Sequence, residues 1–531
     1  MNTRRASLCS VNELGVGEMK QFSVGEKEIL LAHTGDEKFV ATAAKCSHYG
    51  APLANGVMHN GRVVCPWHNA CYNLADGAQL EPPGRNNLAS YTVMVKDGEV
   101  FVELPTDGED HLVPDMASAG GDDRRFVIVG AGAAGLAAAE MLREVGFAGE
   151  VLVLGAEEMM PYDRTKLSKA ALQSDEFDGP SLLRSQDFYA QHDIEIKTNA
   201  PVEKADVRSQ TVTYGKGETV EYDSLLIATG GKVRSLPVDN SDLQNVFTIR
   251  KADDTKEILQ AAKDAKKAVI IGAGFIGMEA AASLRQKGLE VTVVAPNKVP
   301  FEKVLGEEVG AAFQRMHESE GVTFKMESKA KALNGNGKVE SVQLDSGETL
   351  DADLVIVGIG VSPATDFIEG LALDDDDKSV PVNQYLQAAP NVYAAGDIAQ
   401  FPHFASGKSV RIEHWRLAMQ HGRIAAINMA ADETDAVPFK AVPFFWSGQF
   451  DAKLRYVGHS ENYDEIVVQG DLDNQKFLSF YIEEGKVLAV AGIGRDKDIA
   501  AISEMMRLGE MPTVEDVKGE GVDWTKKLAS V

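Results

Sequence analysis

Two short segments near the N-terminus each contain one cysteine and one histidine. The first reads Cys46-Ser-His48, and sixteen residues later the second reads Cys65-Pro-Trp-His68. A [2Fe-2S] cluster with inequivalent irons needs this mixture, with two thiolates on one iron and two imidazoles on the other. Zinc is the alternative, but zinc sites usually group like ligands together, whereas these alternate. The spacing therefore favours a [2Fe-2S] cluster on these four residues and leaves zinc open.

Two glycine-rich segments further along the chain could bind the phosphates of dinucleotides. In a GxGxxG segment the first glycine permits a tight turn, the second admits a pyrophosphate, and the third lets the helix pack closely on the strand. One alone is a weak signal, but both copies here follow an apolar strand and open an alanine-rich helix. The glycines are Gly130, Gly132 and Gly135 after FVIV, and Gly272, Gly274 and Gly277 after AVII.

The residue that follows the next strand usually binds the ribose of the dinucleotide. Glu157 follows VLVLG at the distance where a carboxylate could accept the ribose hydroxyls. After the second glycine segment, the strand VTVVAP ends without an acid, and Asn297 and Lys298 could receive a 2′-phosphate. The sequence therefore does not choose between NADH and NADPH.

Several domains must position these residues, because 531 residues exceed the size of one hydrophobic core. Short alternating strands, such as 39–43 and 91–95, precede a Gly-, Pro- and Asp-rich linker. Apolar strands then alternate with helices, and from residue 437 aromatic-rich strands lead to a helix at 498–508. The expected parts are a small all-β domain (1–105), a linker (106–123), two α/β nucleotide-binding domains (124–247 with 369–436, and 248–368) and an α+β domain (437–531).

Composition excludes several classes of partner. The chain has 53 basic and 80 acidic residues, a net charge of -27, which repels nucleic acid and anionic membranes. No apolar stretch is long enough to span a membrane, and the residues after Arg4 and Arg5 are too polar for an export signal. Four cysteines cannot form a disulfide scaffold. We expect a cytoplasmic protein without nucleic-acid or membrane partners, and a homodimer stays open.

The two metal-binding segments, CSHYGAPL and CPWHNACYNLADG, resemble the Rieske family. High-potential members of that family carry one further cysteine in each loop, and these two cysteines form a disulfide. Here Gly50 or Ala51 and Trp67 stand in those places. The resemblance therefore implies the low-potential, ferredoxin-like branch. Asn69 departs from the family pattern, because most relatives have glycine there.

The rest of the chain resembles the ferredoxin-reductase-like flavoproteins, specifically the Rieske-bearing relatives of apoptosis-inducing factor. The segments PYDRTKLSK, LLIATGG, VGIGVSPAT, NVYAAGDIAQFP and IEHWRLAMQHGR occur in the family's order. The likeness implies two Rossmann-like domains that bind FAD and NAD(P)H. The cofactor contacts that it implies, besides the glycine segments, are Ala134, Glu157, Arg164, Lys169, Val202, Thr229, Gly230, Arg250, Gly360, Gly396, Asp397 and Trp415.

The resemblance also suggests chemical roles. Glu279 would lie near the nicotinamide, although it could be an ordinary surface glutamate. Lys169 or Arg164 could stabilise an anionic reduced flavin. Asp397, between the strand NVYAA and an expected helix start, could accept hydrogen bonds from ribityl hydroxyls. We take Lys169 and Glu279 as the catalytic pair.

Two tryptophans, Trp415 and Trp446, could wall the isoalloxazine ring of the flavin, although large aromatic residues are more often simply core. Both belong to aromatic segments of the C-terminal third of the chain. The sequence alone does not separate the two interpretations.

No cysteine follows Cys71, so the redox disulfide of many related flavoenzymes is absent. Electrons on a flavin would have to leave for a one-electron carrier, a quinone or oxygen. We expect transfer from NAD(P)H to FAD, then to the Rieske cluster, then to an external acceptor such as an oxygenase or ferredoxin. Two alternatives are a reductase for a separate ferredoxin or oxygenase component, and a redox-responsive signalling flavoprotein like apoptosis-inducing factor.

Overall fold

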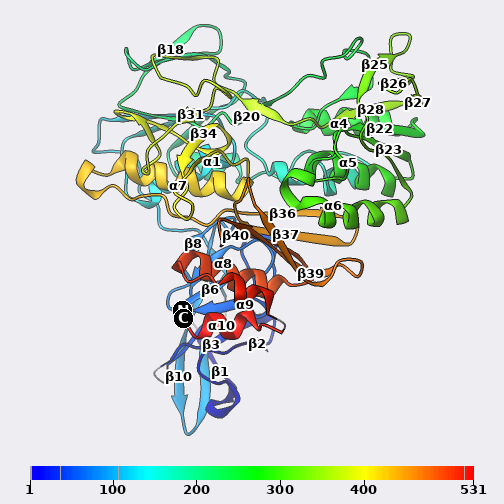
Figure 1. The fold of residues 1–531 in the computed structure, drawn as a ribbon. Helices are drawn as coiled ribbons and strands as arrows, with labels where there is room; N and C mark the ends of the chain where they lie inside the picture. The colour runs from blue at the N-terminus through cyan, green and yellow to red at the C-terminus, as the bar shows by residue number, and fades with distance from the viewer. Residues whose placement is uncertain (1–2, 36–37, 106, 520) are drawn as a thin grey trace.

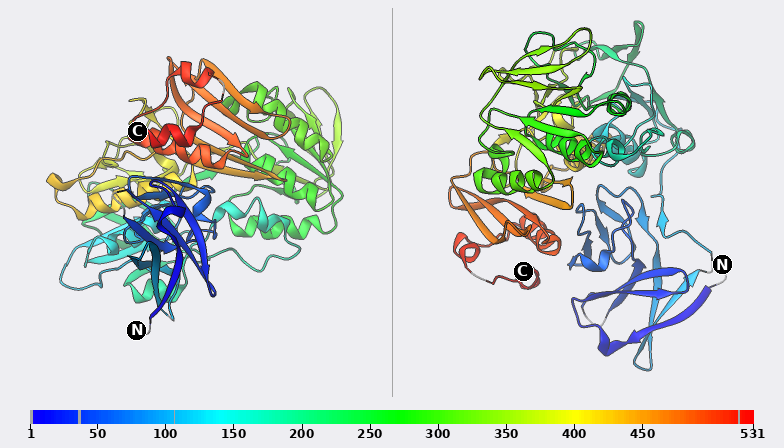
Figure 2. Two further views of the ribbon diagram at one scale, coloured as in Figure 1. Left: turned by 90° about the horizontal axis from the view of Figure 1, so that it is seen from below. Right: turned by 90° about the vertical axis from the view of Figure 1, so that its right-hand side faces the viewer.

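The computed structural model describes residues 3–35, 38–105, 107–519 and 521–531. The predicted domain start at residue 1 and the predicted linker start at residue 106 lie outside these ranges. Figure 1 shows an N-terminal β region in blue, two α/β lobes, and C-terminal strands and helices in orange and red between the lobes and the blue region. The right-hand view of Figure 2 shows the same blue region below the lobes.

The N-terminal region is built from two antiparallel sheets, as the alternating pattern predicts. The predicted strands at 39–43 and 91–95 correspond to β4 (Phe39–Ala43) and β10 (Ser90–Lys96). The larger sheet has the order β1 (Thr3–Ser10), β11 (Glu99–Pro105), β10 (Ser90–Lys96), β4 (Phe39–Ala43), β3 (Lys27–His33) and β2 (Met19–Val24), and the smaller sheet has the order β5 (Val57–His59), β6 (Arg62–Val64), β7 (Cys71–Asn73) and β8 (Gln79–Glu81).

The segment expected to be a linker is more ordered than its composition suggests. Within it, β12 (His111–Leu112) pairs with β9 (Asn87–Leu88) of the N-terminal region. The His111 imidazole also hydrogen-bonds to the carbonyl of Lys45, beside the first metal-binding segment. Backbone pairing therefore ties this segment to the β region, which a Gly- and Pro-rich composition could not reveal.

The first lobe is a parallel sheet with one antiparallel edge strand, and helices cover one of its faces. Its central strands RFVIV, EVLVL and SLLI are nearly continuous apolar runs because both faces of the sheet are buried there. The order is β15 (Ile194–Lys197), β14 (Glu150–Leu154), β13 (Arg125–Val129), β19 (Ser224–Ile227), β33 (Val392–Ala394) and β32 (Gln387–Ala389), and the main helices are α1 (Ala133–Glu144), α3 (Gln186–Gln191) and α7 (Trp415–Ala430).

The second lobe repeats this plan with a five-stranded parallel sheet. A three-stranded antiparallel sheet lies beside it. The parallel order is β21 (Val246–Phe247), β28 (Leu354–Val357), β22 (Lys267–Ile271), β23 (Glu290–Val294) and β24 (Val322–Lys325), the helices are α4 (Ala252–Ala262), α5 (Phe275–Gln286) and α6 (Glu302–Ser319), and the added strands are β25 (Ala330–Asn334), β26 (Ser341–Leu344) and β27 (Thr349–Asp351).

Smaller elements complete the two lobes and connect them. They form one four-stranded sheet, a two-stranded ribbon, a three-stranded sheet and a short helix. The four-stranded sheet has the order β18 (Glu218–Glu221), β17 (Thr211–Tyr214), β16 (Val202–Asp206) and β30 (Ile368–Glu369), and the ribbon pairs β20 (Gly231–Val233) with β29 (Val361–Pro363). The three-stranded sheet has the order β31 (Val380–Pro381), β34 (Ala399–Pro402) and β35 (Ser409–Val410), and the short helix is α2 (Ala170–Gln173).

The C-terminal region packs against both the second lobe and the N-terminal region. Val57 and Val64 of the N-terminal region share one buried cluster with Phe444 and Trp524 of the C-terminal region. The antiparallel order is β36 (Phe444–Gln449), β37 (Ala452–Gly458), β40 (Lys486–Ile493), β39 (Lys476–Glu483) and β38 (Glu465–Asp471), followed by α8 (Asp496–Leu508), α9 (Val514–Lys518) and α10 (Trp524–Ala529). The predicted closing helix at 498–508 is α8.

One face of α7 holds the N-terminal region by polar contacts. Arg416, Gln420 and Arg423 are spaced by four and three residues, so they share that face. Arg416 is 2% exposed and donates from Nε to the Pro82 carbonyl at 2.8 Å and from Nη1 to the Val442 carbonyl at 3.2 Å. Gln420 donates to Glu81, and Arg423 donates to Gln79, both on β8.

Arg416→Ala should loosen this attachment. The substitution leaves two buried carbonyl groups without donors, and we expect a loss of about 2–4 kcal/mol in the free energy of unfolding. Calorimetry of the full chain would show the lowest transition moving down by several degrees. The control is Arg315→Ala, which removes an exposed ion pair with Asp473 and should cost at most ~0.5–1 kcal/mol. Equal losses from both variants would contradict the buried role of Arg416.

Candidate cofactor sites

The two metal-binding segments form loops with the same backbone pattern. In each loop the cysteine amide donates to the carbonyl five residues later, and its carbonyl accepts from the amide four residues later. The fourth residue after the cysteine has a left-handed backbone in both loops, Gly50 at φ 71° and Asn69 at φ 61°. Asparagine is one of the few residues that adopt this conformation readily. Asn69 therefore fills the family's glycine position without changing the loop.

The four predicted metal ligands meet as two pairs. Cys46 and Cys65 are both 1% exposed, and a hydrogen bond from Cys65 lowers the pKa of the Cys46 thiol to about 7. The Nδ1 atoms of His48 and His68 lie 3.0 Å apart. Burial lowers the pKa of His48 to about 4, so the ring is neutral, as a metal ligand must be. One pair of sulfurs and one pair of nitrogens suit two inequivalent irons.

Within the described ranges, no group of three or more His, Cys, Asp or Glu side chains gathers to hold one metal ion. The two thiols form one pair and the two imidazoles form another, whereas a structural zinc site holds four ligands around one centre.

A tyrosine on β7 hydrogen-bonds to this site. The Tyr72 hydroxyl lies 3.2 Å from the Cys46 Sγ atom and accepts from the Ser47 amide at 3.0 Å. The Ser47 hydroxyl lies 3.0 Å from the same oxygen and donates to the Asn86 carbonyl. A donor to a ligand sulfur stabilises the more negative, reduced cluster and raises its reduction potential.

Tyr72→Phe should lower the midpoint potential of the cluster. A hydrogen bond contributes about 0.5–1.5 kcal/mol, which corresponds to a decrease of roughly 20–65 mV for a one-electron couple. A redox titration followed by electron paramagnetic resonance measures the change. Tyr91→Phe is the matched control, because its hydroxyl faces Asp110 at 3.4 Å and contacts neither cysteine. An unchanged potential in Tyr72→Phe would show that this hydroxyl has no influence on the cluster.

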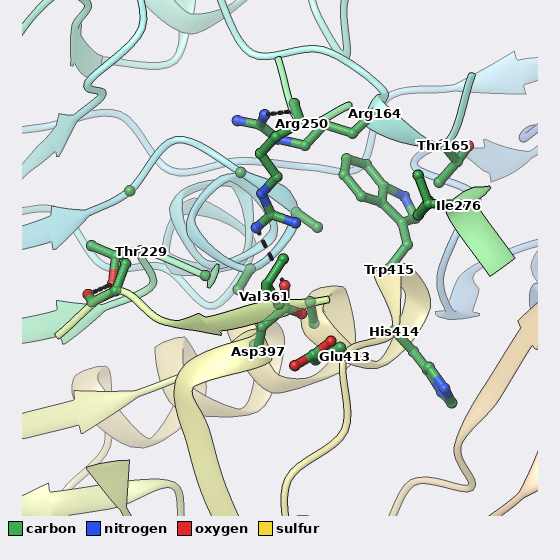
Figure 3. Close-up of a pocket in the computed structure, with 18 of the residues that line it drawn as sticks. Arg164, Thr165, Thr229, Arg250, Ile276, Val361, Asp397, Glu413, His414 and Trp415 are labelled. Atoms are coloured by element: carbon green, nitrogen blue, oxygen red, sulfur yellow. Dashed lines mark hydrogen bonds and ion pairs between the residues drawn. The ribbon is translucent and has the colours of Figure 1, made fainter. Parts of the chain in front are cut away.

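Both glycine segments open onto one cavity of about 1000 Å³ between the lobes (Figure 3). Its walls bring together most of the predicted cofactor contacts. These are Gly130, Gly132, Ala134, Glu157, Arg164, Lys169, Val202, Thr229, Gly230, Arg250, Gly274, Glu279, Gly360, Gly396, Asp397 and Trp415. Gly135, Gly272 and Gly277 do not line it.

The glycines divide into packing and ligand-facing positions. A Cβ atom on Gly135 would lie 1.9 Å from the Gly130 carbonyl oxygen, and one on Gly277 would lie 2.3 Å from the Gly272 carbonyl oxygen. A Cβ atom on Gly132 would meet nothing within 4 Å, and the same holds for Gly274. The second glycine of each segment thus leaves open the space that a pyrophosphate would fill, while the third permits helix packing. This cradle fits a dinucleotide in each lobe.

Gly135→Ala should therefore reduce the stability of the fold, whereas Gly132→Ala should reduce the affinity for FAD. We expect Gly135→Ala to lower the melting temperature of the flavin-free protein, because the new methyl collides with backbone. Gly132→Ala should keep that melting temperature and lose affinity for FAD by tenfold or more, about 1.4 kcal/mol. Calorimetry and FAD titration followed by fluorescence separate the two. If both variants behave alike, the division of roles is wrong.

The first-lobe wall of the cavity is fixed by two ion pairs. Glu157 pairs with Arg164 and accepts from the Tyr162 hydroxyl at 2.5 Å. Arg250 reaches toward Asp397, with Nη2 3.4 Å from Oδ2, as Figure 3 shows. Asp397 lies in a single 3-10 turn, Gly396–Ile398, so the predicted helix start is present, but it ends after one turn because the chain continues directly into β34.

The predicted catalytic pair is in direct contact. The Lys169 Nζ atom lies 2.8 Å from Glu279 Oε2, and Glu279 also accepts hydrogen bonds from Ser168 and Ser447. Glu279 is 3% exposed, which rules out the ordinary surface glutamate considered above. Three donors hold this carboxylate at the cavity wall, and Ser447 brings the C-terminal region into the site.

The sequence offered Trp446 as a possible wall of the flavin site, but it gave no sign that this residue also contacts the metal-binding loops. It lines the cavity, and its ring centroid lies 4.3 Å from that of His68 and 5.9 Å from that of His48. It therefore connects the metal-binding loops to the cavity. The aromatic segment PFFWSGQF predicted the strand that carries Trp446, but it did not predict that this strand lies beside His68. Trp415 also lines the cavity, at the start of α7.

The first metal-binding loop also contacts the cavity segment PYDRTKLSK. The Tyr49 hydroxyl donates to Asp163, which caps the short helical turn Arg164–Lys166 through Thr165. The Lys166 Nζ atom lies 4.5 Å from the centroid of the Tyr49 ring. One segment thus touches a metal-binding loop on one side and the cavity on the other.

The possible 2′-phosphate site is partly occupied by an acid. Asn297 donates to Glu302 at 3.3 Å, and the Lys298 amide donates to the same carboxylate at 3.2 Å. The sequence pattern showed no acid at the strand end because Glu302 belongs to the following helix, α6. Neither Asn297 nor Lys298 lines the cavity.

Three family models match the chain: pyridine nucleotide-disulphide oxidoreductase at residues 124–422, Rieske [2Fe-2S] domain at 5–92 and reductase C-terminal at 444–528. The Rieske match implies a [2Fe-2S] cluster, and the oxidoreductase match implies FAD and NAD(P)H. In the described ranges, none of the helices combines the length and apolar character required to cross a bilayer.

Individual relatives agree with these matches. Apoptosis-inducing factor 3 of Mus musculus is 37% identical over 516 residues, 95% of this chain and 84% of that protein. Rhodocoxin reductase of Rhodococcus erythropolis is 33% identical over 408 residues, 76% of this chain and 94% of that protein. The solved covalent complex of putidaredoxin reductase and putidaredoxin matches with a TM-score of 0.72 and 30% identity, over 77% of this chain and 99% of that one.

Proposed function

Because this chain belongs to the pyridine nucleotide-disulphide oxidoreductase family and carries its own Rieske domain, we propose that it passes electrons from NAD(P)H through FAD to the Rieske cluster and on to an external one-electron acceptor. The position of Trp446 between His68 and the cavity is the observation that carries this proposal. The acceptor class is suggested by relatives named as ferredoxin reductase components of oxygenase systems.

We assign the two dinucleotides to the two lobes, each with a Rossmann-like arrangement. Parallel strand order, a glycine segment after the first strand and a helix after the glycines support this assignment in both. The first lobe, residues 124–247 with 369–436, would hold FAD, and the second, residues 248–368, would hold NAD(P)H. Bound FAD would supply the conversion of a two-electron hydride into single electrons.

The residues of the cavity wall would orient the two cofactors. Glu157 is held by Arg164 and Tyr162 where a carboxylate can accept ribose hydroxyls. Lys169 forms an ion pair with Glu279 at the junction of the two lobes and the C-terminal region. Glu279 takes one N–H donor of the Lys169 ammonium, and the remaining N–H donors would stabilise negative charge that develops on a nearby cofactor atom, without rearrangement at the moment of transfer.

The signalling alternative explains less of the chain. A purely structural N-terminal module would not need two buried thiols and two neutral imidazoles in facing pairs. Nor would it need an aromatic ring between those ligands and the cavity. Both features favour electron transfer.

Removing the cluster should separate flavin reduction from electron output. We expect NADH to bleach the flavin of Cys65→Ser normally in anaerobic stopped-flow, while reduction of cytochrome c in steady state falls tenfold or more. In the wild type the flavin should bleach before the cluster. Cys9→Ser is the matched control, since Cys9 is buried in the same domain and is not one of the four ligands. A wild-type cluster that stays oxidised during turnover would refute the proposed route.

A further inference from the structure

The cavity side of the Rieske cluster is closed to other proteins. His68 packs on Trp446, and Trp446 packs against the apolar cluster that the N-terminal and C-terminal regions share. Arg62 pairs with Glu504 of α8, and Asn69 donates to Ser503 of the same helix at 2.9 Å. A carrier that takes electrons from the cluster must therefore approach from another side.

Two exposed aromatic rings mark that other side. Tyr49 and Trp67 are each 37% exposed, and in the part of the chain that the structure describes Phe404 is the one other aromatic side chain as exposed. The Tyr49 ring stacks on His48 at 3.8 Å and lies 5.7 Å from His68, while the Trp67 ring lies 6.4 Å from His68. Both rings thus extend from the histidine ligands to the surface.

Cations surround these rings, although the whole chain carries a net charge of -27. Lys166 lies over Tyr49, and Arg455 donates to the Trp67 carbonyl at 3.1 Å. Lys453 is exposed two residues before Arg455 on β37, so both side chains lie on the same face of the strand.

Two carboxylates also face this side. Asp163 accepts from the Tyr49 hydroxyl, and Asp496 pairs with Arg455 at 3.3 Å, so both carboxylates already have partners. Lys166 donates to the Ser181 hydroxyl and Lys453 to the Phe450 carbonyl, and among the described residues neither lysine pairs with a carboxylate. Charges more than about 8 Å from a docked carrier are largely screened at physiological ionic strength, so these two unpaired ammonium groups would act on it most strongly.

We propose that Tyr49, Trp67, Lys166 and Lys453, together called the cluster rim, form the docking surface for an acidic one-electron carrier protein. This inference rests on the proposed function, because the cluster must first be reduced from NAD(P)H. One electron leaves the reduced cluster for each carrier, so one NADH and two oxidised carriers yield NAD⁺, one proton and two reduced carriers.

A pair of probes that differ only in surface charge tests the rim. Native cytochrome c is basic, and succinylation replaces its lysine charges with carboxylates around the same haem. Under anaerobic conditions with NADH, we expect the full-length holoenzyme to reduce the succinylated form at least tenfold faster at low salt, and raised salt should remove the advantage. Equal rates, or a faster reaction with the native form, would overturn the proposal.

Charge reversal locates the effect on the rim. Lys166→Glu combined with Lys453→Glu should abolish the preference for the succinylated form and leave the reduction of menadione, an uncharged quinone, unchanged. The matched control combines Lys96→Glu with Lys486→Glu, two exposed lysines on distant hairpins that undergo the same change in net charge. A preference that survives in the rim variant, or is lost equally in the control, would also overturn the proposal.

Trp67→Leu tests whether the ring itself takes part. We expect slower reduction of the succinylated probe at saturating concentration, because the indole no longer extends the path from His68. A rate that stays at the wild-type value would remove Trp67 from the rim. Stopped-flow absorbance of the cluster is recorded in every variant: a cluster that NADH does not reduce contradicts the proposed function, whereas a reduced cluster without charge preference contradicts the rim alone.

Discussion

The contact between the His68 imidazole and the Trp446 indole is the constraint on which the rest of the structure depends. His68 belongs to the Rieske domain, and Trp446 belongs to β36 and lines the cavity between the lobes. Arg455, directly opposite Trp446 in the sheet, holds the carbonyl of Trp67, the residue before His68. The strand pair β36 and β37 therefore holds the second metal-binding loop by two contacts, the Trp446 ring on His68 and the hydrogen bond from Arg455 to the Trp67 carbonyl. These two contacts fix the distance between the cluster site and the cavity.

Different forces hold the Rieske domain in place and orient it. The apolar cluster of Val57, Val64, Phe444 and Trp524 supplies most of the binding free energy, since each fully buried large apolar side chain contributes about 1.5–3 kcal/mol. Each hydrogen bond adds only about 1 kcal/mol net. Burial lowers the pKa of Arg416, which reflects the unfavourable transfer of its charge from water. Its two carbonyl acceptors nevertheless fix one orientation of the domain on α7.

Local sequence patterns predicted the cofactors of this chain, but they could not predict contacts between residues that are far apart in the sequence. The ligand spacing and the glycine segments were informative because a cluster or a pyrophosphate imposes fixed residue types over a few positions. Arg416 offered no such signal, because its partner Pro82 lies over 330 residues away in the sequence. Trp446 was a candidate wall of the flavin site, but its contact with His68 was out of reach of local patterns for the same reason. The expected linker is ordered because β12 pairs with β9, which local patterns also did not predict.

The surroundings of the cluster combine features that act in opposite directions on its potential. All four cysteines are free, so the disulfide of the high-potential branch is missing from the loops. Tyr72 at Cys46 raises the potential, and so do Lys166 and Arg455 beside the histidines, because each stabilises the more negative, reduced state. A single hydrogen bond supplies roughly 20–65 mV of a family range of about 450 mV. The low-potential class implied by the sequence sets the scale, and these neighbours would shift the potential upward within it, which would favour the proposed flow of electrons from NAD(P)H to the cluster.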